Sequence, residues 1–253
     1  MGVGKVGSVK GIQVLKPASY TGEERIVKIM TGSVSLEGNL ILPERAYGMV
    51  IFVHESGSNR FNPTNRFIAK QLHKVGMGAL LFDLLDPWEA EVDKISRNMR
   101  FDIDLMVERV ERVTDWVGQQ PRLDGLQVGY FGSGRGAAAA LIAAAFHPEV
   151  IRAVVSHGGR LDLATTALGQ VTSPTLLVVG KVQSLLKINR TAYQGLAPEL
   201  EKKLEVFKEV SYFWDEPETL EKLSVLTGGW FERYLGDGMR EGMSEEASGL
   251  LTI

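Results

Sequence analysis

The chain has 253 residues, no cysteine and a formal net charge of −3 from 28 basic and 31 acidic side chains. This length, with 44% hydrophobic residues, suits one large α/β domain. The missing cysteines exclude disulfides, thiolate metal sites and a cysteine nucleophile, and the absence of a basic stripe argues against nucleic-acid binding. No apolar stretch reaches membrane-spanning length and no signal-peptide core is present, so we expect a cytoplasmic protein with no membrane partner.

The pattern along the chain predicts a flexible N-terminal arm over residues 1–24, a single domain over 25–236 and a mobile tail over 237–253. Residues 25–30 and 34–42 alternate as two antiparallel strands do. Apolar runs predict buried strands at 48–54, 78–83, 126–131, 151–156 and 174–180, with a more exposed last strand at 203–210. Helical periodicity is expected at 62–75, 101–119, 135–147, 184–196 and 217–235. Apolar strands alternating with helices indicate a mostly parallel, twisted sheet of about seven or eight strands with helices on both faces.

Five residues in the middle of the chain carry the most specific signal. Gly132-Ser133-Gly134-Arg135-Gly136 ends the apolar run 126–131 and begins the alanine-rich run 137–145. This is the layout of a nucleophile elbow, G-x-nucleophile-x-G, in which a tight strand-to-helix turn exposes the attacking residue. Its flanking glycines are needed because the turn leaves no room for a Cβ. The central residue here is Gly134, which has no side chain to attack with.

The elbow and its neighbouring loops resemble the α/β-hydrolase fold, and more closely the dienelactone hydrolase-related family. The resemblance covers roughly residues 25–235. The stretches that carry it are 52–60 (FVHESGSNR), 62–66 (NPTNR), 80–85, 129–132, 136–141 and 152–163 (RAVVSHGGRLDL). The resemblance implies an α/β-hydrolase fold and a triad in the chain order nucleophile, acid, histidine.

At each position where the family places a catalytic group, this chain carries a residue that cannot do that work. The resemblance places the nucleophile at Gly134, the acid at Val182, shortly after a strand, and the histidine at Tyr212. We therefore expect the triad to be absent. Ser133 stands beside the apex, and as a nucleophile it would need Phe131 and Arg135 where glycines belong.

The resemblance also points to an oxyanion loop that begins at His54. Glu55 and Ser56 follow in that loop, and the second oxyanion donor is the backbone N–H of Arg135. A Glu55 carboxylate turned into the hole opposes a developing oxyanion; alternatively it pairs with Arg135, binds a cationic or hydroxylated ligand, or is simply exposed. The residues expected to line the pocket are Glu55, Ser56, Ser133, Gly134, Arg135, His157, Val182 and Tyr212.

Four histidines are available as a replacement base. His54 is expected to brace the oxyanion loop, His73 lies on an amphipathic helix, and His147 suits a helix C-terminus. His157 follows a strand at the carboxyl edge of the sheet, where ligands bind in open α/β folds. Together with Glu55 it is the relocated catalytic candidate, although a structural role is the simpler interpretation.

Other chemistry has weaker support. Asp83, Asp86 and Glu89 follow one strand and leave paired-carboxylate chemistry open. Neither H-x-x-x-H nor a dense Asp/Glu/His cluster is present, so no metal is expected. The spacing G-x-G-x-G comes late in the sheet and differs from the dinucleotide fingerprint, so no cofactor is expected.

These observations favour a pseudoenzyme that binds a small apolar ligand without hydrolysing it. Three alternatives stay open: an isomerase, lyase or cyclase that uses relocated acid–base groups, a residual ester hydrolase, and a structural or scaffold protein. A homodimer is compatible with the sequence because most soluble oligomers are symmetric dimers, but no segment marks the interface.

Overall fold

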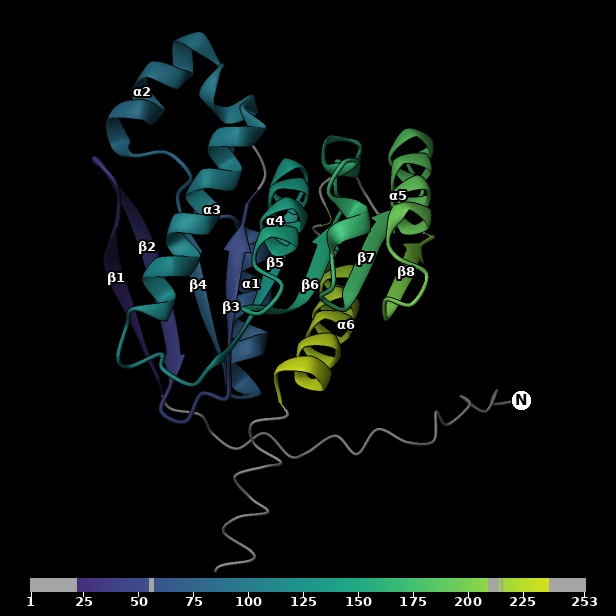
Figure 1. Cartoon of the computed structure of the whole chain (residues 1–253). Helices are drawn as coiled ribbons and strands as arrows, with labels where there is room; N and C mark the ends of the chain where they lie inside the picture. The colour runs from purple at the N-terminus through teal and green to yellow at the C-terminus, as the bar shows by residue number, and fades with distance from the viewer. Residues whose placement is uncertain (1–21, 55–56, 209–213, 215, 237–253) are drawn as a thin grey trace, which may run out of the picture.

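The computed structural model describes residues 22–54, 57–208, 214 and 216–236. Eight strands form one sheet in the order β1-β2-β4-β3-β5-β6-β7-β8 (Figure 1). Their bounds are β1 Gly22–Thr31, β2 Val34–Pro43, β3 Gly48–Val53, β4 Met77–Phe82, β5 Gln127–Ser133, β6 Ile151–His157, β7 Thr175–Gly180 and β8 Lys202–Phe207. The strands from β4 to β8 run parallel, and the β1–β2 hairpin joins β4 antiparallel.

Helices cover both faces of this sheet (Figure 1). α3 (Ile103–Gly118), α4 (Arg135–Phe146) and α5 (Gln183–Gly195) lie on one face, and α1 (Pro63–Lys74) and α6 (Pro217–Leu235) lie on the other. α2 (Pro87–Ser96) follows β4 beyond the carboxyl edge of the sheet, and short 3₁₀ helices occur at Met99–Phe101 (η1), Leu161–Ala164 (η2) and Leu168–Gln170 (η3). The predicted α/β-hydrolase architecture is therefore confirmed.

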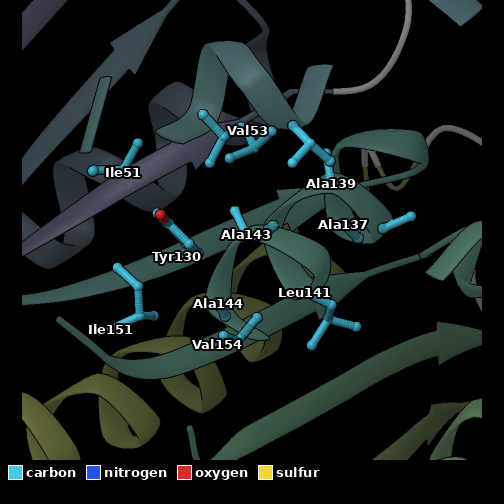
Figure 2. Close-up of a cluster of buried hydrophobic side chains, with 14 of the residues drawn as sticks. Ile51, Val53, Tyr130, Ala137, Ala139, Leu141, Ala143, Ala144, Ile151 and Val154 are labelled. Carbon is cyan, nitrogen blue, oxygen red and sulfur yellow. The ribbon is translucent and has the colours of Figure 1, made fainter. Parts of the chain in front are cut away.

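The hydrophobic core has two halves because the central strands are buried on both faces. Ile51 of β3, Tyr130 of β5 and Leu141 of α4 belong to the half under α3 and α4 (Figure 2). Phe52 and Phe231 belong to the half under α1 and α6. Successive residues of a strand point to opposite faces, so a strand covered on both faces is apolar throughout. Six of the seven alanines of α4 are fully buried, and their small side chains let this helix pack closely on the sheet.

The predicted elements agree with the structure apart from two corrections. β1 begins at Gly22, so residues 22–24, expected in a flexible arm, belong to a strand. Their polar side chains gave no strand signal because this strand lies at the exposed end of the sheet. The sequence analysis also missed α2. The expected arm over 1–21 and the tail over 237–253 lie outside the described residues.

None of the helices in the described part of the chain is both long enough and apolar enough to cross a membrane.

Candidate functional site

A tight turn joins β5 to α4 at the centre of the sheet's carboxyl edge. Gly134 stands at its apex as the N-cap of α4, with φ 54° and ψ −122°. L-residues rarely adopt this conformation, whereas glycine adopts it freely. A Cβ at Gly132 would lie 2.5 Å from Ala137 Cα, and one at Gly136 would overlap the Val53 carbonyl oxygen. The turn therefore has the backbone of a nucleophile elbow with glycine at its apex.

Hydrogen bonds hold the elbow against the loop that follows β6. The Gly134 N–H donates to the His157 carbonyl at 3.2 Å, and the Arg160 N–H donates to the Gly134 carbonyl at 2.9 Å. Ser133 ends β5 beside His157 in register. The apex, Ser133 and His157 are thus brought together, and Ser133 stands one residue before the apex.

His157 is a buried histidine that has no polar partner within the part of the chain that the structure describes. Its side chain is 8% exposed, and neither ring nitrogen has a hydrogen-bond partner among the described residues. The ring lies 4.4 Å from that of Trp214, nearly perpendicular, and 6.1 Å from that of Phe131. Burial lowers the pKa of His157 to about 4, because the charged ring would lose its hydration. The imidazole is therefore neutral near pH 7.

Trp214 adopts a backbone conformation that is unusual for a residue with a side chain. Its φ is 54°, and the indole packs against both His157 and Phe207. Such backbone strain persists only where the surrounding packing imposes it. The aromatic wall at this edge is thus held in place by tertiary contacts.

Arg135 is the first residue of α4 after the apex. Its guanidinium lies 4.8 Å from the centre of the Phe101 ring, in cation–π geometry. This contact attaches the start of α4 to η1. Arg160, the other arginine of this edge, binds Asp162 through two hydrogen bonds of 2.9 and 2.8 Å.

A cavity of about 400 Å³ lies beside the elbow, between the loop after β3 and the segment from α2 to α3. That volume is in the range of small-molecule sites. Its walls include the apolar side chains of Leu84, Leu85, Met99, Leu105 and Met106. The elbow residues Ser133 and Gly134 and the ring of His157 are not among its lining residues.

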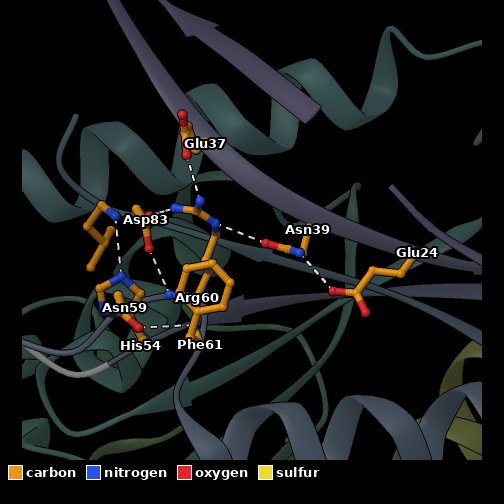
Figure 3. Close-up of polar contacts among 9 residues, drawn as sticks. Glu24, Glu37, Asn39, His54, Asn59, Arg60, Phe61 and Asp83 are labelled. Atoms are coloured by element: carbon orange, nitrogen blue, oxygen red, sulfur yellow. Dashed lines mark hydrogen bonds and ion pairs between the residues drawn. The ribbon is translucent and has the colours of Figure 1, made fainter. Parts of the chain in front are cut away.

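Arg60 organises the loop that follows β3 and lines the cavity (Figure 3). Its backbone N–H donates to Asp83 Oδ1 at 2.7 Å, and its guanidinium also pairs with the same carboxylate. The guanidinium further donates to Glu37 Oε2 at 2.6 Å and to Asn39 Oδ1 at 3.0 Å. Arg60 thus fixes the loop to β2 and to the end of β4.

A second ion pair, between Asp93 and Arg100, also lines the cavity. Asp93 is fully buried, and its Oδ2 accepts from Arg100 Nε at 2.5 Å. The hydrogen bond and charge of Arg100 outweigh burial and lower the pKa of Asp93. Arg100 also lies next to Gly57, so this pair positions η1 against the loop after β3. The lining of the cavity therefore combines apolar side chains with two arginine–carboxylate ion pairs.

Solved structures with this arrangement are hydrolases. The crystal structure of a dienelactone hydrolase from Anabaena variabilis is 42% identical and matches 84% of this chain and 98% of its own, with a TM-score of 0.81. The chain belongs to the dienelactone hydrolase family. A dienelactone hydrolase-like promiscuous phosphotriesterase from metagenomic libraries shares the fold at 16% identity and a TM-score of 0.68.

Two Mycobacterium tuberculosis proteins, from strains CDC 1551 and H37Rv, are each 43% identical over 210 residues and carry the provisional name phosphoribosyl transferase. The match covers 83% of this chain but 46% of those proteins, so the chain spans about half the length of the curated relatives it matches. No family model matches the chain.

Two of the three positions at which the sequence predicts a missing triad group lie within the described residues. Gly134 occupies the elbow apex, and Val182 occupies the loop after β7, where it is the N-cap of α5 and is 49% exposed. Tyr212 lies outside the described residues, as do Glu55 and Ser56 of the predicted oxyanion loop. The expected pairing of Glu55 with Arg135 therefore stays a prediction.

The carboxylates that follow β4 are used in holding the structure together. Asp83 binds Arg60, and Asp86 caps α2 by accepting from the Glu89 N–H at 2.7 Å. The Glu89 carboxylate in turn accepts a hydrogen bond from the Asp86 N–H at 3.0 Å, and it pairs with the buried Arg109 at 2.7 Å. The paired-carboxylate chemistry considered from the sequence is not supported, because each group already has a structural partner.

Three histidines lie away from the apex or have structural contacts. His54 braces its loop as predicted, since its Nε2 accepts from the Leu84 N–H at 3.3 Å (Figure 3). His147 ends α4, also as predicted, with Glu111 3.6 Å away. His73 lies on α1, and burial lowers its pKa. Within the described ranges, no group of three histidine, aspartate or glutamate side chains is arranged to hold a metal ion.

The cavity and the arginines Arg60 and Arg100 in its lining were not predicted from the sequence. Four separate segments build it, and none carries a local signal for a cavity. One part could have been found, because Asp86-Pro87-Trp88-Glu89 has the spacing of a capping box and marks the start of α2.

Proposed function

We propose that this protein is a non-hydrolytic member of the dienelactone hydrolase family that binds a small, largely apolar molecule beside the elbow. The observation that carries this proposal is Gly134 at the apex, in the backbone conformation of the elbow residue. Acyl transfer in this family's geometry begins with attack from that residue, and glycine has no atom to attack with.

Other residues at the carboxyl edge of the sheet support the same proposal. The loop after β7 carries Val182 where the family's acid is expected, so a base would lack its orienting carboxylate. Loss of triad groups lowers turnover by several orders of magnitude. The apolar side chains that line the cavity suit an apolar ligand, and its two ion pairs suit a ligand that also carries a hydrogen-bonding group.

Phosphoribosyl transfer is not carried over from the M. tuberculosis proteins. The matched part is less than half of those chains, whereas the likeness to dienelactone hydrolase extends over nearly all of the solved chain. A lactone or ester related to the substrates of such hydrolases is therefore the first ligand class to examine.

Hydrolysis of p-nitrophenyl acetate and butyrate tests the missing chemistry. The wild type is compared with Gly134→Ser/Val182→Asp/Tyr212→His, and with the matched triple variant that carries Gly134→Ala. Activity in the serine variant alone, with a silent wild type, is the expected result. Wild-type turnover above background that is lost in Ser133→Ala or His157→Phe contradicts the proposal.

Binding is tested separately by saturation-transfer NMR with p-nitrophenyl butyrate as the probe. Leu105→Glu places a charge at the cavity wall, and Val225→Glu places the same charge on the exposed surface of α6. We expect transfer in the wild type and in Val225→Glu, and its loss in Leu105→Glu. Equal transfer in all three proteins places the ligand elsewhere.

A second function is favoured by one observation, the ring of His157, whose nitrogens have no hydrogen-bond partner among residues 22–54, 57–208, 214 and 216–236. These neutral nitrogens beside the apex suit proton transfer without covalent attack, as in an isomerase or lyase. This alternative predicts an activity that His157→Phe abolishes without lowering the melting temperature. Unchanged activity in that variant removes it.

A further inference from the structure

The outer strand of the sheet presents a long, regular and exposed edge. β1 is the terminal strand, and all ten of its residues pair with β2 without a register shift (Figure 1). It contains no proline, and two apolar side chains on it are exposed, Ile26 at 72% and Met30 at 61%. Proteins normally shorten, bend or cover such an edge, because its free backbone groups can pair with another strand.

The backbone groups on the free side can be identified from the neighbouring strand. Glu37 of β2 accepts a hydrogen bond at its carbonyl from the Asp83 N–H at 2.9 Å, so its backbone faces β4 and not β1. Lys28 lies opposite Glu37, and its N–H and C=O therefore point to the free edge. Because strands alternate with a period of two, the same holds for the other even-numbered residues of β1, and their side chains share one face.

We propose that β1 pairs antiparallel with β1 of a second copy of this chain, about a two-fold axis that passes through Ile26. The two eight-stranded sheets then become one continuous sheet. In this register each outward-facing residue has an outward-facing partner: Gly22 lies opposite Met30, Glu24 opposite Lys28, and Ile26 opposite its own symmetry mate. The exposed Ile26 side chains pack together at the axis.

Charge complementarity selects this register over its neighbours. Centring the pair on Glu24 or on Lys28 sets like charges opposite each other, which destabilises a cross-strand pair. Centring it on Val27 pairs fewer outward residues and leaves both charges opposite apolar side chains. Only the axis at Ile26 forms two Glu24–Lys28 pairs and uses all five outward residues, as an isologous interface requires.

Glu24 is prepared for this role within its own protomer. Its carboxylate accepts from Arg66 at 2.8 and 3.0 Å and from Asn39 at 2.7 Å. The Arg66 hydrogen bond lowers the pKa of Glu24, so the carboxylate is charged. Its side chain remains 36% exposed, which leaves it accessible to a lysine across the edge.

Sedimentation equilibrium of the full chain tests the proposal at about 100 µM, where a dimer of micromolar affinity predominates. We expect twice the protomer mass of 27.8 kDa. In a Lys28→Glu dimer, both Glu24–Lys28 pairs become pairs of two glutamates. The dissociation constant should therefore rise at least tenfold. Ile26→Pro removes an N–H that points outward, so it should abolish the dimer and keep the circular dichroism spectrum of the fold.

A mixing experiment separates the interface from general effects of charge. Glu24→Lys and Lys28→Glu each repel their own kind, but together they place lysine opposite glutamate at every charged position. We expect each variant alone to dimerise at least tenfold more weakly than the wild type, and the equimolar mixture to form a heterodimer. Ile95→Lys, a control at an exposed apolar residue of α2, should remain dimeric. A monomeric wild type, or a dimer that Ile26→Pro and the charge variants leave intact, overturns the proposal.

Discussion

The backbone at Gly134 leads to a quantitative prediction for Gly134→Ala. A residue with a side chain held at φ 54° and ψ −122° is strained by about 1–3 kcal/mol. Alanine also reduces the conformational entropy of the unfolded chain, which stabilises the folded state by about 0.4–1 kcal/mol. We therefore expect a net loss of about 1–2 kcal/mol in the free energy of unfolding, which lowers the melting temperature of a chain this size by about 2–8 °C.

Gly228→Ala is the matched control for this measurement. Gly228 lies inside α6, and a Cβ added there meets nothing within 4 Å. The same substitution should stabilise the protein there by about 0.5–1 kcal/mol, because glycine is unfavourable in a helix interior. Urea unfolding followed by circular dichroism measures both variants. A Gly134→Ala protein as stable as the wild type refutes the conformation assigned to the apex.

Three further predictions concern buried polar groups. The pKa of His157 is about 4 in the folded protein and about 6.5 when unfolded, so its contribution to stability is complete above pH 6.5 and is lost as the pH falls toward 4. The urea midpoint of His157→Phe should therefore lack that part of the wild type's pH dependence. If the two proteins show the same pH profile, the burial of the ring is contradicted. Glu89→Ala leaves the buried Arg109 without its carboxylate and should lower the free energy of unfolding by about 3–5 kcal/mol. The double variant Glu89→Met/Arg109→Met should lose less stability than this single change. Additive losses in a double-mutant cycle would argue against the ion pair. Tyr130→Phe removes a hydroxyl that lies 2.6 Å from Thr114 Oγ1 in the core. Thr114 keeps its bond to the Val110 carbonyl, so the loss should be about 1 kcal/mol by thermal melting, and a loss several times larger would mean that the hydroxyl has another role.

The sequence predicts most of the sheet because the central strands are apolar on both faces. β3, for example, is buried at every position, and its run of apolar residues needs no alternation to be recognised. The start of β1 could not be predicted in the same way, since Gly22, Glu23 and Glu24 are exposed at the end of the sheet. Their strand conformation depends on pairing with β2 and not on their own composition.

The site was predictable where it depends on local backbone and not where it depends on distant contacts. Glycine spacing located the elbow at Gly134, because its close packing leaves no alternative residue at Gly132 or Gly136. The apolar surroundings of His157 include Trp214, which is 57 positions further along the chain and has no sequence signal that points to this contact. The cavity could not be predicted for the same reason, because its walls come from separate segments that meet only after folding.

Arg60 gives the loop beside the cavity a stability that its own length does not provide. Through Asn39 and Glu24, its hydrogen bonds continue from Asp83 across β2 to the outermost strand. Local openings of a protein follow cooperative units held together by such shared contacts. The loop and the β1–β2 hairpin therefore form one unit, and their amides should exchange hydrogen with similar opening free energies. A change in the outermost strand β1 should therefore reach the lining of the candidate ligand site through the Arg60 guanidinium.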